Sequence, residues 1–241
     1  MKLSKFEKDI LEKISYCPTI PNSRYHNSNG LVIPSVTELL SFIDNESLIG
    51  WANWMGRQGR DTKEILNTAA SYGTNTHNAI DKYLDGDDSC QMKPTASYKS
   101  FLSWYQKLKE EHRVEILGHE EPMKNEYFAG TYDLLLKIDD KIVLVDFKTS
   151  NHVGYKYFIQ LAAYRYLLYT TKNINIHGCL ILHLGKNGII PKAKEYYLDF
   201  TTPEHYNLIE YSFKSFLGIL YAYYNVHHCK QLFDSIFKGK K

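Results

Sequence analysis

Asp133, Asp146 and Lys148 carry side chains suited to metal binding and phosphate chemistry, and their spacing predicts that they meet. A polar pair between them, Asp139-Asp140, separates two apolar runs and predicts a β-hairpin with a tight turn. A two-residue turn places Asp133 opposite Asp146 on the neighbouring strand. Because side chains alternate between the two faces of a strand, Lys148 shares the face of Asp146.

Two carboxylates directly opposite each other repel by about 3 kcal/mol at a separation of roughly 5 Å and an effective dielectric constant near 20. A cation between them removes this repulsion. Lys148 supplies one positive charge, but a divalent metal ion held by oxygen ligands fits the geometry better. The alternative is that both aspartates lie on a solvated face and never meet, since a slip of one residue in the register separates them.

The elements around this hairpin predict an α/β protein with a mixed β-sheet flanked by helices. A helical lobe at residues 1–112 precedes a core at residues 113–241. Hydrophobic periodicity and turn residues predict strands at 114–123, 127–138, 141–149, 178–184 and 195–200. The same signals predict a loop through Pro18, Pro21 and Gly30, and helices at 3–15, 35–43, 45–56, 61–84, 95–112, 153–171 and 203–228.

The composition is that of an ordinary globular protein, with 44% hydrophobic and 23% charged residues among 241. A formal net charge of +2 creates no general basic field, so nucleic-acid binding requires a local patch. The four cysteines are scattered, without the spacing of a metal cluster, which predicts a reduced, intracellular protein. The chain shows no secretory leader and no run of eighteen apolar residues, so we expect no membrane attachment.

Two helical residue pairs extend the set of candidate functional residues. Gly73 and His77 lie one turn apart, and a glycine inside a helix costs about 1 kcal/mol relative to alanine. The glycine therefore indicates a bulky neighbour beside His77, either a strand or a substrate. Gln160 and Tyr164 lie one turn apart on a later helix. Taken alone, each of these residues is also compatible with a structural role.

Together, these motifs resemble the PD-(D/E)XK nuclease superfamily, and within it the RecB-like exonucleases. The set is most similar to stand-alone phage-type exonucleases and to the mitochondrial genome-maintenance exonucleases. This resemblance implies a restriction-endonuclease-like core. The motifs occur in the family's order over about residues 34–164: Ser35-Val36-Thr37 after Pro34, Gly73-x-x-x-His77, Glu120 or Glu121, Gly130-Thr131-x-Asp133, Asp146-x-Lys148-Thr149-Ser150 and Gln160-x-x-x-Tyr164.

The resemblance implies a site for one or two Mg²⁺ or Mn²⁺ ions. Asp133, Asp146 and the backbone carbonyl of Phe147 would supply oxygen ligands, and His77 a nitrogen ligand that makes Mn²⁺ acceptable as well as Mg²⁺. The iron–sulfur branch of the family is disfavoured, because the cysteine cluster that it requires is missing. We therefore expect no iron–sulfur cluster.

The family pattern also implies catalytic roles. Lys148 would position or help activate the attacking water and offset charge on the phosphate. Glu120, which matches the family's strand glutamate better than Glu121, would bind water on the metal ion. Gln160 and Tyr164 would contact the scissile phosphate or orient Lys148.

DNA contacts are expected from the N-terminal helices. Ser35 and Thr37 begin a helix whose free backbone amides favour phosphate. Arg57 and Arg60 are weaker phosphate candidates. Base stacking, which favours single strands or frayed ends, is expected from Trp51, Trp54 or Tyr72.

The resemblance thus implies a metal-dependent exonuclease that acts on DNA ends, single-stranded or frayed, in replication, recombination or repair. A replication or recombination protein is the expected partner, in the cytoplasm of a bacterial or phage-infected cell or in an organelle. One alternative is a catalytically silent DNA-binding module on the same fold, against which Asp133, Asp146 and Lys148 argue. Another is a restriction-like endonuclease, against which the Gln160-x-x-x-Tyr164 helix argues.

Overall fold

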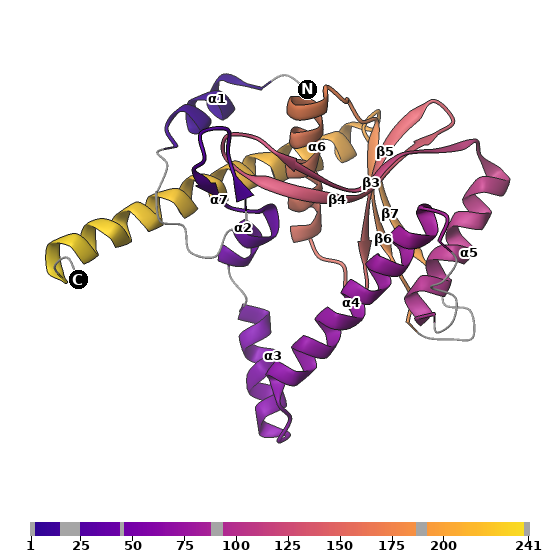
Figure 1. Cartoon of the computed structure of the whole chain (residues 1–241), viewed down its shortest axis with the longest axis horizontal. Coiled ribbons are helices and arrows are strands. Elements are labelled where there is room, and N and C mark those ends of the chain that lie inside the picture. The colour runs from indigo at the N-terminus through magenta and orange to yellow at the C-terminus, as the bar shows by residue number, and fades with distance from the viewer. Residues whose placement is uncertain (1–2, 15–24, 44–45, 88–93, 187–191, 239–241) are drawn as a thin grey trace.

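The computed structural model describes residues 3–14, 25–43, 46–87, 94–186 and 192–238. Its centre is a five-stranded sheet in which strand order follows chain order, β3-β4-β5-β6-β7 (Figure 1). The β5–β6 pair is parallel and the other pairs are antiparallel, so the predicted mixed sheet is confirmed. The strands are β3 (Val114–Lys124), β4 (Ala129–Ile138), β5 (Lys141–Lys148), β6 (Gly178–His183) and β7 (Lys194–Asp199).

The β4–β5 hairpin has the predicted register. Ile138 pairs with Lys141 across the two-residue turn, and the ladder continues without a shift to Leu134 opposite Val145. Asp139 in the turn has a φ of +53°, a conformation that tight hairpin turns require and that aspartate tolerates. The turn chemistry therefore sets the register, since both strands are buried on both faces and show no alternation of burial.

Helices cover both faces of this sheet (Figure 1). One buried cluster joins the sheet to α1, α2, α6 and α7, and a second joins its other face to α4 and α5. Helix α6 is buried continuously from Ile159 to Leu168, because it lies between the sheet and α7. The helices are α1 (Lys5–Glu12), α2 (Val36–Phe42), α3 (Glu46–Arg57), α4 (Thr62–Leu84), α5 (Ala96–Glu111), α6 (Lys156–Lys172) and α7 (Pro203–Phe237).

A small antiparallel hairpin, β1 (Tyr25–His26) and β2 (Val32–Ile33), lies within the segment predicted as loop. The Asn27 side chain closes it by accepting hydrogen bonds from the backbone N–H groups of Asn29 and Leu31. Strands of two residues carry no alternating pattern, so periodicity missed them. Pro18 and Pro21 of the predicted loop lie outside the described residues.

Helix α7 continues to Phe237, whereas the predicted end was His228. No glycine or proline interrupts the chain between His228 and Gly239, so nothing in this segment ends the helix earlier. Its C-terminal end extends beyond the sheet (Figure 1).

Helices α3 and α4 form a hairpin that projects away from the sheet, and α4 returns to the sheet at its C-terminal half (Figure 1). Thr76 and Ile80 anchor that half by full burial. Helices α1 and α2 pack against α6 and α7, and the predicted division of the chain at residue 112 stays a prediction. No helix in the described part of the chain is long and apolar enough to cross a membrane.

Candidate active site

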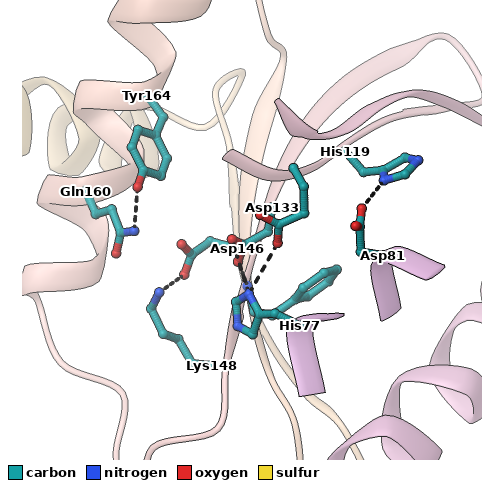
Figure 2. Close-up of polar contacts among 10 residues, drawn as sticks. His77, Asp81, His119, Asp133, Asp146, Lys148, Gln160 and Tyr164 are labelled. Carbon is teal, nitrogen blue, oxygen red and sulfur yellow. Dashed lines mark hydrogen bonds and ion pairs between the residues drawn. The ribbon is translucent and has the colours of Figure 1, made fainter. Parts of the chain in front are cut away.

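Asp133 lies where the β4–β5 ladder ends. Its Oδ2 accepts a hydrogen bond of 2.6 Å from the backbone N–H of Phe147, so a side chain replaces the backbone pairing at this point. Its Oδ1 lies 3.5 Å from Nδ1 of His77, which α4 brings to the sheet (Figure 2). The Phe147 ring packs edge-on against the imidazole, with ring centroids 5.7 Å apart. The predicted approach of His77 to Asp133 is therefore present in the structure.

Glu120 joins His77 and Asp133 in a cluster of three metal-ligand side chains, each offering one atom within 4.8 Å of the others. Its Oε1 lies 3.5 Å from Nδ1 of His77. In the pairing of β3 with β4, His119 lies opposite Leu134 and Glu121 lies opposite Tyr132. Glu120, between these two pairs, therefore lies beside Asp133 on the neighbouring strand.

Glu120 has a φ of +45°, a left-handed conformation that is uncommon outside glycine and often marks a functional position. The side chain of the next residue, Glu121, pairs instead with Lys172 on α6. The structure therefore places Glu120, and not Glu121, in the cluster.

The cluster is strongly coupled electrostatically. Burial by itself lowers the pKa of the His77 imidazole, but Asp133, Glu120 and Asp146 outweigh it and raise the pKa to about 10. Burial raises the pKa of Asp133, but His77, Lys148 and the Phe147 N–H outweigh it, so that pKa is lowered. Without a metal ion, the pair is an imidazolium and a carboxylate at neutral pH. A divalent cation at this position would displace the imidazolium proton.

Asp146 is 1% exposed and lies beside Lys148, whose Nζ is 2.5 Å from Oδ2 (Figure 2). Burial raises the pKa of Asp146 to about 6, against the lowering effect of Lys148. Its Oδ1 accepts no hydrogen bond from the described residues. A buried carboxylate oxygen without a partner is costly, and a metal ion would satisfy it. Carboxylate oxygens with one imidazole form a donor set that suits Mg²⁺ or Mn²⁺.

Gln160 and Tyr164 line the site from α6. Gln160 Nε2 donates a 2.9 Å hydrogen bond to the Tyr164 hydroxyl, and both side chains are buried (Figure 2). Burial raises the pKa of Tyr164, and the nearby Asp146 raises it further. The Tyr164 ring packs so closely on Gly130 that a Cβ there would lie 2.5 Å from Cε1. Two motifs far apart in the sequence are thus joined by direct packing.

The bulky neighbour expected beside Gly73 is the end of β5. A Cβ at Gly73 would lie 3.3 Å from Oγ1 of Thr149, which is tighter than ordinary contact. Of the two alternatives, a strand or a substrate, the contact is with the chain itself, at the residue directly after β5.

The residues expected to contact DNA are not gathered at the cluster. Ser35 caps α2, accepting a 3.1 Å hydrogen bond from the Glu38 N–H, and its Oγ lies 3.1 Å from Oγ1 of Thr37. Arg57 ends α3, Arg60 follows it, and both are exposed; Trp51 is half-buried. Arg60 lies just before α4, whose first residue, Thr62, precedes His77 by about 22 Å along the helix axis. The DNA contacts stay predictions.

Sequence reasoning missed the contacts that fix α4 against β3. His119 Nδ1 lies 2.6 Å from Oδ1 of Asp81 (Figure 2). Its Nε2 lies 3.4 Å from Oδ1 of Asp85. The signal was present, because Asp81 and Asp85 follow His77 at intervals of four residues and so share its helix face. These contacts hold the helix that carries His77 beside the strand that carries Glu120.

Two of the four cysteines, Cys17 and Cys90, lie outside the described residues. Cys179 is a buried free thiol and Cys229 an exposed one. The absence of an iron–sulfur cluster therefore stays a prediction.

The family model described as the PD-(D/E)XK nuclease superfamily matches residues 57–213. The match spans more than half of the chain, so the chain belongs to this superfamily, and the predicted superfamily and restriction-endonuclease-like core are confirmed. Membership supports a nuclease. Nucleases of this superfamily use divalent metal ions, and the cluster of His77, Glu120 and Asp133 could bind one.

Two solved structures are among those that match the chain. The protein titled SSO0001 is 14% identical, with a TM-score of 0.36, over 87% of this chain and 83% of its own. A phage-related exonuclease from Haemophilus somnus 129PT is 12% identical, with a TM-score of 0.34, over 86% of this chain and 97% of its own. These values are too low to support any inference about activity. No curated protein sequence matches the chain.

Proposed function

We propose that this chain is a divalent-metal-dependent deoxyribonuclease of the RecB-like type that removes nucleotides from DNA ends. The observation that supports it best is the meeting of the His77–Glu120–Asp133 cluster with the Asp146–Lys148 pair where β4 and β5 cease to pair. The packing of Tyr164 on Gly130 supports the RecB-like assignment, because it links two of that group's motifs.

His77, Glu120, Asp133 and Asp146 would hold one or two Mg²⁺ or Mn²⁺ ions, with the Phe147 carbonyl as a further proposed ligand. When bound, the metal would lower the pKa of a water molecule and stabilise negative charge on the phosphate. The partly buried carboxylates and imidazole of this cluster support that proposal.

Lys148 acts as a cation in this proposal. Burial by itself lowers the pKa of its amine, but Asp146 and Asp133 outweigh burial and raise the pKa. Lys148 is therefore protonated at neutral pH, which suits it to donating hydrogen bonds to the phosphate or to the attacking water. The same charge makes it unsuitable as the base that removes a proton from water.

Gln160 and Tyr164 form the wall on the α6 side, where Gln160 would contact the scissile phosphate or orient Lys148. Further DNA contacts are proposed for the N-terminal helices, at Ser35, Thr37, Trp51, Arg57 and Arg60. The proposed substrate is a single-stranded or frayed DNA end. A replication or recombination partner and a cytoplasmic or organellar location stay predictions.

A cleavage assay tests this proposal with end-labelled linear DNA and closed circular DNA, each single- and double-stranded, in Mg²⁺, Mn²⁺ or a chelator. We expect metal-dependent release of nucleotides from linear DNA and little action on closed circles. Efficient cutting of closed circles would instead favour a restriction-like endonuclease. DNA binding without cutting in either metal would favour the catalytically silent module.

A pair of aspartate variants on one hairpin sharpens this assay. Asp133→Asn should reduce cleavage by roughly 100-fold or more, because it removes a charge from the metal site. Asp140→Asn is the matched control, since Asp140 lies in the turn with its side chain 93% exposed. Thermal unfolding gives a second readout: a metal at 100 times its Kd should stabilise the parent chain by about 2.7 kcal/mol. Equal metal stabilisation of Asp133→Asn would remove Asp133 from the metal site.

A further inference from the structure

Tyr157, in the first turn of α6, lies against the ammonium group of Lys148. The Lys148 Nζ lies 4.8 Å from the centroid of the Tyr157 ring, within the range of a cation–π interaction. The same Nζ lies 2.5 Å from Oδ2 of Asp146, and the Lys148 side chain is only 16% exposed. The ammonium group is therefore held between a carboxylate and an aromatic face.

The hydroxyl of Tyr157 contacts the segment that follows β5. It donates a 3.1 Å hydrogen bond to Oγ of Ser150, and that hydroxyl donates a 2.8 Å hydrogen bond to the backbone carbonyl of His152. The Ser150 carbonyl in turn lies 2.6 Å from Nε2 of His183 on β6. The segment between β5 and α6 is thus tied to the Tyr157 hydroxyl and to β6, while α6 itself carries the aromatic ring.

We infer that Tyr157 is a positioning residue for Lys148. The four-carbon stem of a lysine has many rotamers, and a single carboxylate partner leaves the ammonium free to pivot. The aromatic face limits that freedom, because the ammonium group contacts both the Tyr157 ring and the Asp146 carboxylate. This inference rests on the proposed function, because it assigns Tyr157 to the action of Lys148 on the phosphate.

Two substitutions separate the ring from the hydroxyl. Tyr157→Phe keeps the aromatic face, and we expect its kcat to stay within about threefold of the parent value. Tyr157→Leu fills similar space without an aromatic face and should lower kcat about tenfold, with KM changed by less than about twofold. Tyr155→Leu is the matched control, because Tyr155 is 68% exposed at the start of the same helix. Parental kcat in Tyr157→Leu, or equal loss in Tyr157→Phe, would overturn the inference.

Chemical labelling tests the contact without any nuclease activity. Trace acetylation of the metal-free protein, read by mass spectrometry, compares Lys148 with Lys107, whose side chain is 71% exposed. Lys148 labelling should rise about threefold or more in Tyr157→Leu and stay unchanged in Tyr157→Phe. Unchanged labelling in Tyr157→Leu would overturn the inference. A chain that cuts no DNA but shows the labelling change would refute the proposed function alone.

Discussion

Replacing Gly130 with alanine should distort the α6 wall of the site. A Cβ at this position would lie 2.5 Å from Cε1 and 3.2 Å from Cδ1 of Tyr164, and 3.4 Å from Cγ2 of Val36. Tyr164 is 3% exposed and Val36 is fully buried, so neither has room to move aside. Displacing the ring also breaks the hydrogen bond from Gln160 to the Tyr164 hydroxyl.

The expected destabilisation follows from these two effects. Overpacking a buried position costs about 1–3 kcal/mol, and a lost buried hydrogen bond adds about 1 kcal/mol. We therefore expect the free energy of unfolding to fall by about 2–4 kcal/mol, which for a chain of this size lowers Tm by roughly 5–15 °C. Circular dichroism during heating measures this directly, and urea unfolding gives the free energy.

Gly218→Ala is the matched control. Gly218 lies inside α7, and a Cβ there meets no atom within 4 Å, so alanine should stabilise the helix by about 0.5–1 kcal/mol. The double variant Gly130→Ala with Tyr164→Leu has room for the added methyl group. Its loss in the free energy of unfolding should therefore be smaller than the sum of the losses in the two single variants. A parental Tm for Gly130→Ala, or strictly additive losses, would refute the steric explanation.

The remaining predictions concern charge and accessibility. Without added metal, the parent chain should be more stable than His77→Gln by at least about 1 kcal/mol at pH 6. The folded chain raises the His77 pKa from 6.5 to about 10, so the stabilisation by the imidazolium is complete below pH 6.5. That advantage should disappear as the pH rises through about 10, and a difference that is flat with pH in urea unfolding would contradict it. Lys148→Ala should abolish cleavage. It should also lower the free energy of unfolding by about 3 kcal/mol at pH 8, because it leaves the buried Asp146 carboxylate without its cation. The loss should be smaller at pH 5, below the Asp146 pKa of about 6, where this carboxyl group is protonated. Equal losses at both pH values would refute this pairing. Iodoacetamide should label Cys229 in the native protein and spare Cys179 until unfolding, because burial raises the pKa of the Cys179 thiol; mass spectrometry distinguishes the two sites.

The core of the site could be predicted because its information is local. Asp139-Asp140 interrupts two apolar runs, and this alone set the register that brings Asp133 toward Asp146. A close neighbour beside His77 could be predicted because Gly73 lies one helical turn before it, and the glycine does meet Thr149, the residue after β5. The proposed role of His77 as a metal ligand came from the resemblance to the family.

The rest depends on tertiary structure that no local pattern encodes. Glu120 could be predicted only through the resemblance to the family, because its left-handed φ on β3 is not something that strand periodicity predicts. The contact of Asp133 with the Phe147 N–H lies where the pairing of β4 with β5 ends, and the pattern of the hairpin does not predict where that end falls. The burial of Lys148 likewise depends on Tyr157, whose helix follows the strand only after a connecting segment.

The agreement between strand order and chain order has a consequence for folding. Strands β3, β4 and β5 form two consecutive hairpins, whose contacts are short in sequence and are expected to form early. The contact of His77 with Asp133 joins α4 to β4 over a long sequence separation, so it is expected to form later. An intermediate with an intact sheet but an undocked α4 would hold the acidic residues without the imidazole. We therefore expect catalytic competence to appear only when α4 docks, so that activity reports on complete folding and not on formation of the sheet.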